Sequence, residues 1–183
     1  ADFDPGLGTF NLSAQSSDVF ISKLDAAGNF LWAKLMGGAD YDYPESIAVD
    51  ANSNVYTVGY FEQTADLNPS LATYSLTSTG TDDSFISKLD SAGNFLWAKQ
   101  IGGTGYDYAS ELFVGAIGNV YMSGSFEQTV DFDPNATTYA LTSVGAEDIF
   151  ISKLDSAGNF VWARSMGSIN GDVSASIFID NSY

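Results

Sequence analysis

The sequence predicts an all-β fold in which blades of four antiparallel strands repeat along the chain, the architecture of a β-propeller. Three observations lead to this prediction. Nearly the same twenty residues return at a spacing of about 65, as Asp18–Gly38, Asp83–Gly103 and Asp148–Ser168. Within each copy the side chains alternate as in strands, and glycine-containing turns separate those strands. No stretch shows the 3.6-residue period and the end caps of a helix.

Each copy contains four segments that favour a strand. The first is a short apolar run, Ser46–Asp50, and the second, Asn54–Phe61, is rich in β-branched and aromatic residues. The outer two, Asp18–Asp25 and Asn29–Lys34, alternate between apolar and polar residues. Gly28 lies in the turn between them, where glycine adopts a positive φ at no steric cost. We therefore expect these two segments to form the outer hairpin of a blade.

The repeat predicts how the chain is divided. Residues 1–44 form the end of one blade with its outer hairpin, and residues 45–109 and 110–174 form whole blades. Residues 175–183 supply the inner strand of the next blade. This is a partial ring, two whole blades plus parts of two more, and a closed propeller needs at least about four blades. We expect a fragment of a longer chain; the alternatives are blades completed between copies and, for the fold itself, a stacked β-solenoid.

The composition limits the classes of function. The 183 residues carry 23 acidic and 6 basic side chains and a formal net charge of −17, which excludes nucleic acid and anionic lipid as partners. The same charge attracts cations, and calcium is the cation that oxygen-rich loops usually bind. The absence of cysteine and histidine excludes disulfides, zinc sites with nitrogen or sulfur ligands, and histidine acid–base catalysis. No apolar run is long enough to insert into a membrane.

The residues of the copy also resemble a known repeat. The pattern that runs from "GGADYDYPESIAVD" through "NVYTVGYF" to "DSFISKLDSAGNFLWAKQIGG" is similar to the SBBP-type bacterial β-propeller repeat. That repeat occurs in large secreted and surface proteins of Bacteroidetes, so the resemblance implies an extracellular or cell-surface location. It implies no activity, because the repeat family has no shared catalytic residues.

Two sets of repeated side chains lie on the outer hairpins. One tryptophan per blade offers a stacking surface for sugars, but its position on an alternating strand favours packing between blades. The basic side chains occupy only two positions of the repeat, and ion pairs with the hairpin aspartates are their simplest explanation. These residues are Trp32, Trp97 and Trp162; Lys23, Lys88, Lys153, Lys34, Lys99 and Arg164; and Asp25, Asp90 and Asp155.

Acidic loops are candidate calcium sites. In each copy two oxygen-bearing side chains stand at positions i and i+2 before a proline, and calcium takes six to eight oxygen ligands, several of them from one loop. The alternative is a turn in which the first aspartate caps its own backbone. The candidate calcium ligands are Asp2, Asp4, Asp66, Asn68, Asp131 and Asp133.

The loops that precede the inner strands are the candidate ligand site. They combine tyrosine with aspartate, which suits carbohydrate or peptide ligands, and they differ between copies. The alternative is that the tyrosines pack under the loop while the aspartates cap a turn. The candidate ligand-binding residues are Asp40, Tyr41, Asp42, Tyr43, Tyr106, Asp107 and Tyr108.

These features predict a non-catalytic extracellular scaffold or binding module, part of a larger adhesion or structural protein. Asp40 and Asp42 form a pair of carboxylates of the kind that glycosidases use, but a catalytic pair is normally unique in a chain and these positions mostly repeat. Partners are further blades of the same chain or of another copy, and a glycan or protein ligand. A lectin-like propeller is the alternative, and a polysaccharide hydrolase or lyase is the more distant one.

Overall fold

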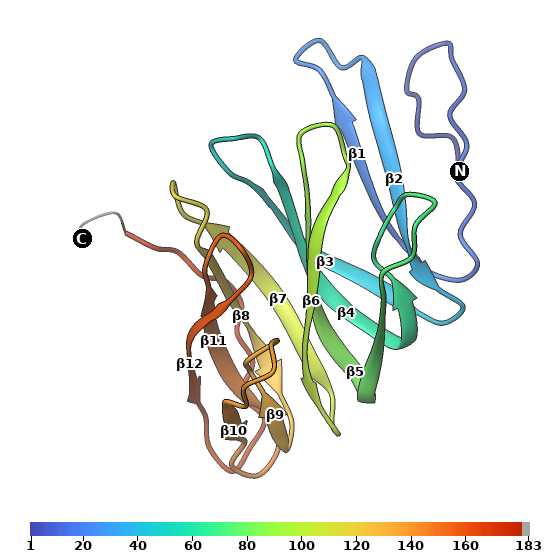
Figure 1. Cartoon of the computed structure of the whole chain (residues 1–183). Helices are drawn as coiled ribbons and strands as arrows, with labels where there is room; N and C mark the ends of the chain where they lie inside the picture. Colours follow the sequence, from blue (N-terminus) through green and yellow to red (C-terminus); the bar gives the residue numbers. More distant parts are fainter. Residues whose placement is uncertain (181–183) are drawn as a thin grey trace.

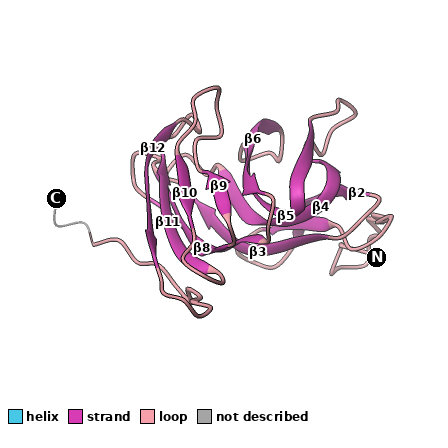
Figure 2. Ribbon diagram, turned by 90° about the horizontal axis from the view of Figure 1, so that it is seen from below, coloured by secondary structure: helices cyan, strands magenta, loops and turns pink. Residues whose placement is uncertain are grey.

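The computed structural model describes residues 1–180, and this range contains strands and turns but no helix (Figure 2). The strands form successive antiparallel groups along the chain, and the two ends of the chain lie on opposite sides of the array (Figure 1). The described residues do not close into a ring. The prediction of an all-β array of propeller blades that forms a partial ring is confirmed.

Each whole blade is a sheet of four antiparallel strands. The strands of the middle blade are β3 (Asp42–Val49), β4 (Val55–Asp66), β5 (Ser75–Leu89) and β6 (Phe95–Gly103). Those of the third blade are β7 (Asp107–Val114), β8 (Val120–Phe126), β11 (Asp148–Leu154) and β12 (Phe160–Met166). The outer hairpin of the first blade consists of β1 (Val19–Leu24) and β2 (Phe30–Gly38).

The inner strand of the middle blade begins earlier than the sequence indicated. It starts at Asp42 rather than Glu45, because Asp42 pairs with Phe61 and Tyr43 pairs with Tyr60. The third blade repeats this arrangement from Asp107 onward. Half of each predicted ligand loop is therefore strand, which fixes the direction of its side chains.

A second hairpin in each repeat connects neighbouring blades. In the third blade it consists of β9 (Thr129–Asp131) and β10 (Ala140–Thr142), and in the middle blade the end of β4 and the start of β5 form the same structure over residues 64–77. We call residues 64–77 and 129–142 the bridging hairpins. Each pairs with the outer strand of the preceding blade, β2 or β6. Blades are thus joined by backbone hydrogen bonds as well as by packing.

The contact between the outer strand and the bridging hairpin requires glycine. A Cβ atom on Gly38 would lie 2.1 Å from the backbone oxygen of Thr64, and one on Gly103 would lie 2.2 Å from that of Thr129. Real Cβ atoms do not approach a backbone oxygen so closely. The repeated glycine pair at the end of the outer hairpin is therefore a packing requirement between blades.

The hydrophobic core lies between the blades. One cluster joins the middle and third blades and includes Tyr56, Leu112 and Phe150, and the other joins the first and middle blades and includes Ile21 and Phe85. Face-to-face packing of this kind buries both faces of the central strands β4 and β5 of the middle sheet. The repeated outer hairpins supply the same apolar residues to each cluster.

The predicted inner strand of the next blade is not formed. Residues 175–180 have no strand assignment, and residues 181–183 lie outside the described residues. The segment nevertheless lies against the third blade, where Ser174 hydrogen-bonds Ser110 at 3.1 Å and Phe178 contacts Phe113. An inner strand becomes a strand by pairing with its neighbour, as β7 does with β8.

Candidate functional site

Five tyrosines form a continuous aromatic row across the middle and third blades. Ring centroids are 6.0 Å apart between Tyr41 and Tyr43, 5.0 Å between Tyr43 and Tyr60, and 4.5 Å between Tyr60 and Tyr108. Tyr106 completes the row at 5.9 Å from Tyr108. We call these five residues the tyrosine row. The row brings together four of the predicted ligand-binding residues from two different repeats.

The ends of the tyrosine row face solvent. Tyr41 is 49% exposed, Tyr43 36% and Tyr106 43%. Tyr60 was not predicted as a site residue, although the pairing of β3 with β4 places it directly opposite Tyr43. Residues that lie directly opposite on paired strands are neighbours, so the pairing of Tyr43 with Tyr60 would have indicated Tyr60. That inference requires the register of β3 against β4, which the sequence alone does not provide.

Carboxylates surround the tyrosine row. The hydroxyl of Tyr108 donates a hydrogen bond to Asp82 at 2.9 Å, and Asp82 is only 5% exposed. Burial, and then the charges of Asp82 and Asp40, raise the pKa of Glu62. Burial, and then the charge of Glu45 among others, raise the pKa of Tyr60. The row therefore lies in a region of negative potential.

A hollow of about 280 Å³ opens beside the centre of the row. Tyr60 and Tyr108 form one part of its wall, and Glu45 lines it with a carboxylate. This volume is at the low end of pockets that hold drug-sized ligands, which run from about 300 to 1,000 Å³. It has the size for a single long side chain.

Asp42 and Asp107 do not belong to this surface, which corrects the prediction that they bind ligand. Each is 1% exposed, and each accepts a hydrogen bond at 2.7 Å from the backbone of the preceding outer strand, at Gly38 or Gly103. The start of β3 and β7 turns these side chains inward, toward the junction between blades. The buried position also removes Asp42 from a catalytic pair with Asp40, because a substrate does not reach it.

Each buried aspartate has a second carboxylate beside it. A Cβ atom on Gly37 would lie 2.7 Å from Oδ2 of Asp42 and 2.9 Å from Cγ of Asp18, so both carboxyl groups lie over one glycine. At the next junction a Cβ atom on Gly102 would lie 2.1 Å from Cγ of Asp83, which is 0% exposed and whose charge acts on Asp107. We call Asp18–Asp42 and Asp83–Asp107 the junction pairs.

Burial raises the pKa of three of these carboxyl groups, Asp42, Asp83 and Asp107. Burial raises the pKa of Asp42 to about 7, against the hydrogen bond from Gly38 and with help from the charge of Asp18. Burial raises the pKa of Asp107 to about 7 as well, with help from the charge of Asp83. The Oδ1 atoms of all four carboxylates are buried and have no hydrogen-bond partner within the described range. Near neutral pH Asp42 and Asp107 are therefore partly protonated.

The acidic loops predicted as calcium sites form capped turns. Oδ1 of Asp2 accepts from Asp4 N at 3.1 Å and Phe10 N at 2.8 Å, and Oδ1 of Asp131 accepts from Asp133 N at 3.0 Å and Tyr139 N at 2.9 Å. Asp66 and Asn68 repeat this geometry. Among residues 1–180 no three acidic side chains gather in a way that could hold a metal ion. Calcium binding stays a prediction, and these loops have the geometry of Asx turns.

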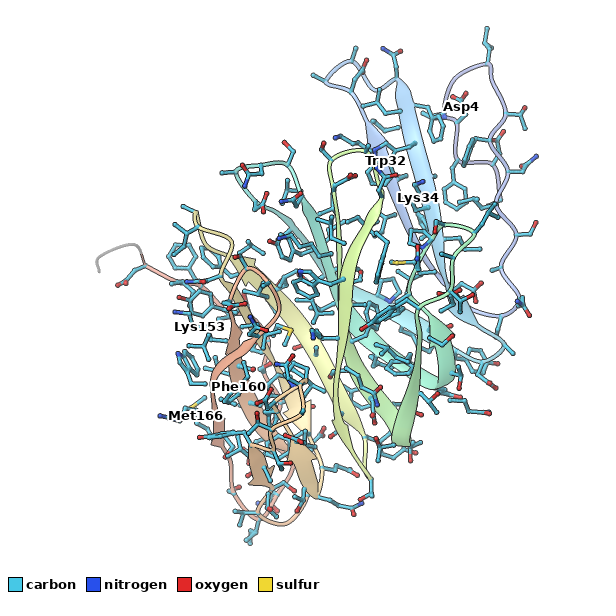
Figure 3. All side chains as sticks on the ribbon, in the orientation of Figure 1. Asp4, Trp32, Lys34, Lys153, Phe160 and Met166 are labelled. Carbon is cyan, nitrogen blue, oxygen red and sulfur yellow. The ribbon has the colours of Figure 1, made fainter. Side chains whose placement is uncertain are left out.

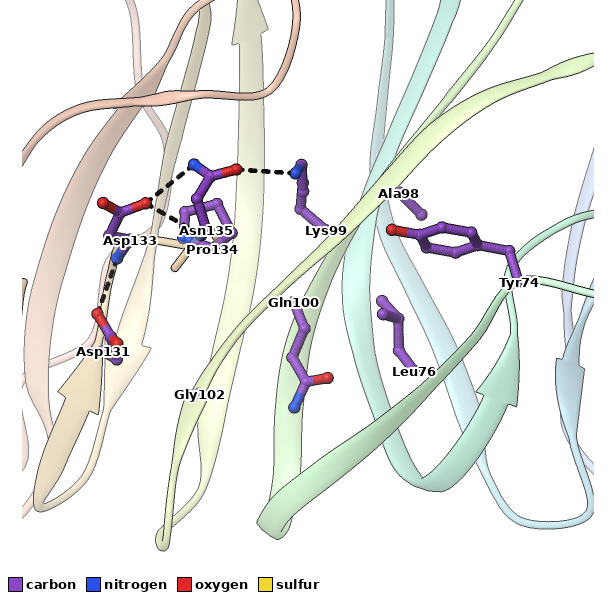
Figure 4. Close-up of a pocket in the computed structure, with 10 residues that line it drawn as sticks. All are labelled: Tyr74, Leu76, Ala98, Lys99, Gln100, Gly102, Asp131, Asp133, Pro134 and Asn135. Atoms are coloured by element: carbon purple, nitrogen blue, oxygen red, sulfur yellow. Dashed lines mark hydrogen bonds between the residues drawn. The ribbon is translucent and has the colours of Figure 1, made fainter. Parts of the chain in front are cut away.

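A groove runs along the rim of the array between β6 and the third blade's bridging hairpin (Figure 4). Tyr74 stands on one side, and on the other Lys99 donates to Oδ1 of Asn135 at 3.0 Å while Asn135 donates to Asp133. Its volume is about 300 Å³. We call it the rim groove. It is lined by Tyr74, Leu76, Ala98, Lys99, Gln100, Gly102, Asp131, Asp133, Pro134 and Asn135.

The tryptophans and lysines of the outer hairpins serve packing between blades. Nε1 of Trp32 and Nζ of Lys23 both donate to the backbone oxygen of Ser91 in the next blade, at 3.2 and 2.8 Å. Lys88 donates in the same way to Ser156. Figure 3 shows Trp32 near the tip of its hairpin, on the side of the next blade. The expected ion pair of the lysines with Asp25 is wrong, because that carboxylate caps its own turn.

The fold and its repeated junctions define a protein built from β-propeller repeats. Residues 31–60, which run from the outer strand of the first blade into the middle blade, match the model of the SBBP family, described as a beta-propeller repeat. The match covers strands at the first junction and agrees with the propeller blades of the fold. No helix in residues 1–180 is long and apolar enough to cross a membrane.

Two curated proteins are similar to the chain over most of its length. An uncharacterized WD repeat-containing protein of Acanthamoeba polyphaga mimivirus is 28% identical over 92% of the chain, and the regulatory protein FlaEY of Caulobacter vibrioides is 26% identical over 91%. The chain spans only 13% and 17% of those two proteins. The likeness supports a propeller scaffold.

Proposed function

We propose that the chain is part of a non-catalytic, extracellular scaffold that binds a macromolecular ligand through the tyrosine row. The observation that carries this proposal is the row itself: five rings from two blades lie in line, and three of them are at least a third exposed. Tyrosine offers a flat apolar face and a hydroxyl, a combination enriched in binding surfaces. Burial of Asp42 speaks against a hydrolase or lyase based on the Asp40–Asp42 pair.

Further copies of the repeat are the proposed partners of the first junction. Ile47 and Val49 on β3 are 57% and 58% exposed, whereas Leu112, the equivalent of Ile47, is 6% exposed under the middle blade. With Ile21 and Trp32 they line an apolar hollow of about 200 Å³. An inner pair of strands from another repeat, in the same chain or a second copy, fits this position.

The rim groove favours a second candidate function, carbohydrate binding. It combines one aromatic wall, Tyr74, with amide and carboxylate groups from Gln100 and Asp133, and sugars are bound by such combinations of stacking and hydrogen bonds. A smaller groove at the first junction repeats it between β2 and residues 66–70. A repeated groove suits multivalent binding to a polymer.

The experiment compares the two surfaces on one ligand panel. The chain and two variants, Tyr41→Ser with Tyr106→Ser and Tyr74→Ser alone, are tested against arrays of glycans and of peptides. The proposal expects ligands whose binding is lost in the double variant and kept in Tyr74→Ser. Binding that is lost in Tyr74→Ser and kept in the double variant would show that the rim groove, and not the tyrosine row, binds the ligand. Turnover of a polysaccharide by the unmodified chain would contradict a non-catalytic role.

A further inference from the structure

The charge around the tyrosine row indicates which kind of ligand it fits. We propose that the row binds a basic peptide segment of a partner protein, with one lysine or arginine side chain entering the hollow between Tyr60, Tyr108 and Glu45. This inference rests on the proposed function and names its ligand class.

The surface of the row carries only negative charge. Asp40, Glu45, Glu62 and Asp82 act on its tyrosines and on one another, as the raised pKa values of Tyr60 and Glu62 show. Glu127 adjoins the far end, where its backbone N–H donates to the oxygen of Tyr106 at 3.0 Å. An anionic ligand is repelled here, and a cationic one is attracted over several ångströms.

No basic side chain of this protein neutralises these carboxylates. All six cations lie on the outer hairpins, and none lies on β3, β4, β7 or β8. Their charged groups are directed to the next blade, as with Lys23 at Ser91 and Lys88 at Ser156, or to the bridging hairpin, as with Lys99 at Asn135. The positive charge that complements the row must come from outside.

The aromatic rings strengthen the preference for a cation. A lysine or arginine over the face of a tyrosine is attracted by the negative face of the ring, and the attraction is stronger when water is excluded. The fold already uses this contact internally, with Nζ of Lys88 4.8 Å from the ring centre of Tyr56 and Nζ of Lys153 5.0 Å from that of Tyr121. The exposed faces of Tyr41 and Tyr106 offer the same contact to a partner.

A buried acceptor, Asp82, lies behind Tyr108, which is one of the residues that line the hollow. Asp82 receives the Tyr108 hydroxyl on Oδ2, while its Oδ1 is buried and has no partner among the described residues. A carboxylate oxygen in this state is costly unless a donor reaches it, and the terminal N–H groups of a long basic side chain are such donors. The hollow, about 280 Å³, has room for a single long side chain.

The test measures binding of three synthetic peptides to the full chain by calorimetry at about 0.15 M salt, where long-range attraction is screened. The peptides have the same length and alternate serine with lysine, glutamine or glutamate. We expect binding of the lysine peptide only. Glu45→Gln should weaken it by about 3- to 10-fold, and Tyr41→Ser with Tyr106→Ser by about 5- to 20-fold.

Asp25→Asn is the matched control, because it removes the same unit of charge at a hairpin tip and keeps the oxygen that caps its turn. It should change affinity by less than about 2-fold. Equal weakening by Glu45→Gln and Asp25→Asn, or equal binding of the glutamine peptide, would overturn the inference. Glycan binding that depends on Tyr41 and Tyr106, without peptide binding, would overturn it but support the proposed function. If the substitutions at Tyr41 and Tyr106 change neither the affinity for the peptides nor the binding of glycans, both proposals fail.

Discussion

Each junction between two blades has an outer half, formed by the outer strand and the bridging hairpin, and an inner half, formed around the inner strands. The outer halves of the two junctions are alike, and the inner halves differ. In both, a bridging hairpin pairs with the preceding outer strand, a carboxylate lies over a glycine of that strand, and a lysine reaches the turn of the next blade. At the second junction β7 also packs on β3, β4 and β5, while at the first junction the preceding blade offers β3 only the hairpin β1–β2. The repeated residues thus build the outer half of a junction unaided, whereas the inner half needs a complete neighbouring blade.

The largest expected effect is at the outer half. Gly103→Ala places a Cβ atom 2.2 Å from the oxygen of Thr129 and should separate β6 from β9, at a cost of about 3 kcal/mol or more in the free energy of unfolding. Gly38→Ala should behave alike at the first junction. Urea unfolding measures both, with Gly115→Ala as control, because its nearest neighbour would be 3.7 Å away. Full stability of Gly103→Ala would show that the hairpin does not join the blades.

The inner halves should differ most clearly at one repeat position. Leu112→Ala removes a side chain that is 6% exposed and should cost about 2–4 kcal/mol, whereas Ile47→Ala removes its 57% exposed equivalent and should cost less than about 1 kcal/mol. The same urea titrations decide this. Equal costs would mean that another part of the molecule covers Ile47 in solution.

The junction pairs should make stability depend on pH in the same way at both junctions. The pKa of Asp107 is about 7 when folded and near 4 when unfolded, so the folded state holds the extra proton. Its stabilising contribution is therefore complete below about pH 4 and lost as the pH rises through 7, a change on the order of 2 kcal/mol. Unfolding of the wild type, Asp107→Asn and Asp42→Asn from pH 4 to 8 measures the slope.

In each of the two variants, Asp42→Asn and Asp107→Asn, the free energy of unfolding should depend less on pH. Each should also be more stable than the wild type at pH 8, because no charge remains to be buried. Asp90→Asn serves as control, since hydrogen bonds from Asn94 lower the pKa of Asp90 and give it the opposite dependence. An unchanged slope in both Asp42→Asn and Asp107→Asn would exclude proton uptake at these pairs.

The smallest effect is expected at the lysines. Lys88→Met leaves the oxygen of Ser156 without its donor and should cost about 1 kcal/mol. Lys23→Met should cost less than about 0.5 kcal/mol, because Trp32 still donates to Ser91. Thermal unfolding separates the two, and a larger loss for Lys23→Met would contradict the role assigned to Trp32.

Features that depend on the local period were predictable from the sequence. The alternation in Asp18–Asp25 and the glycine turn at Gly28 lead directly to β1, β2 and the hairpin between them. Packing of the tryptophans between blades followed from their spacing of one per repeat. These features require only neighbours within one repeat, which the sequence displays.

Features that depend on register between distant segments were not predictable. The bridging hairpins pair with a strand of another blade, and nothing in the composition of residues 129–142 indicates that partner. Asp42 looked like a loop residue beside Tyr41, and only its pairing with Phe61 turns it inward. Tyr60 joins the tyrosine row for the same reason. Of the five tyrosines in the row, four were among the predicted residues, and Tyr60 on β4 was the one that the sequence did not indicate.

The bridging hairpins also bear on the order in which the chain acquires its structure. A hairpin as short as β9–β10 is unstable alone, and its outer partner β6 belongs to the blade that is synthesised earlier. During synthesis the outer strand of each completed blade is therefore available to pair with the bridging hairpin of the next blade. We expect assembly of the array to advance from the N-terminal end, one blade at a time, at the pace of translation.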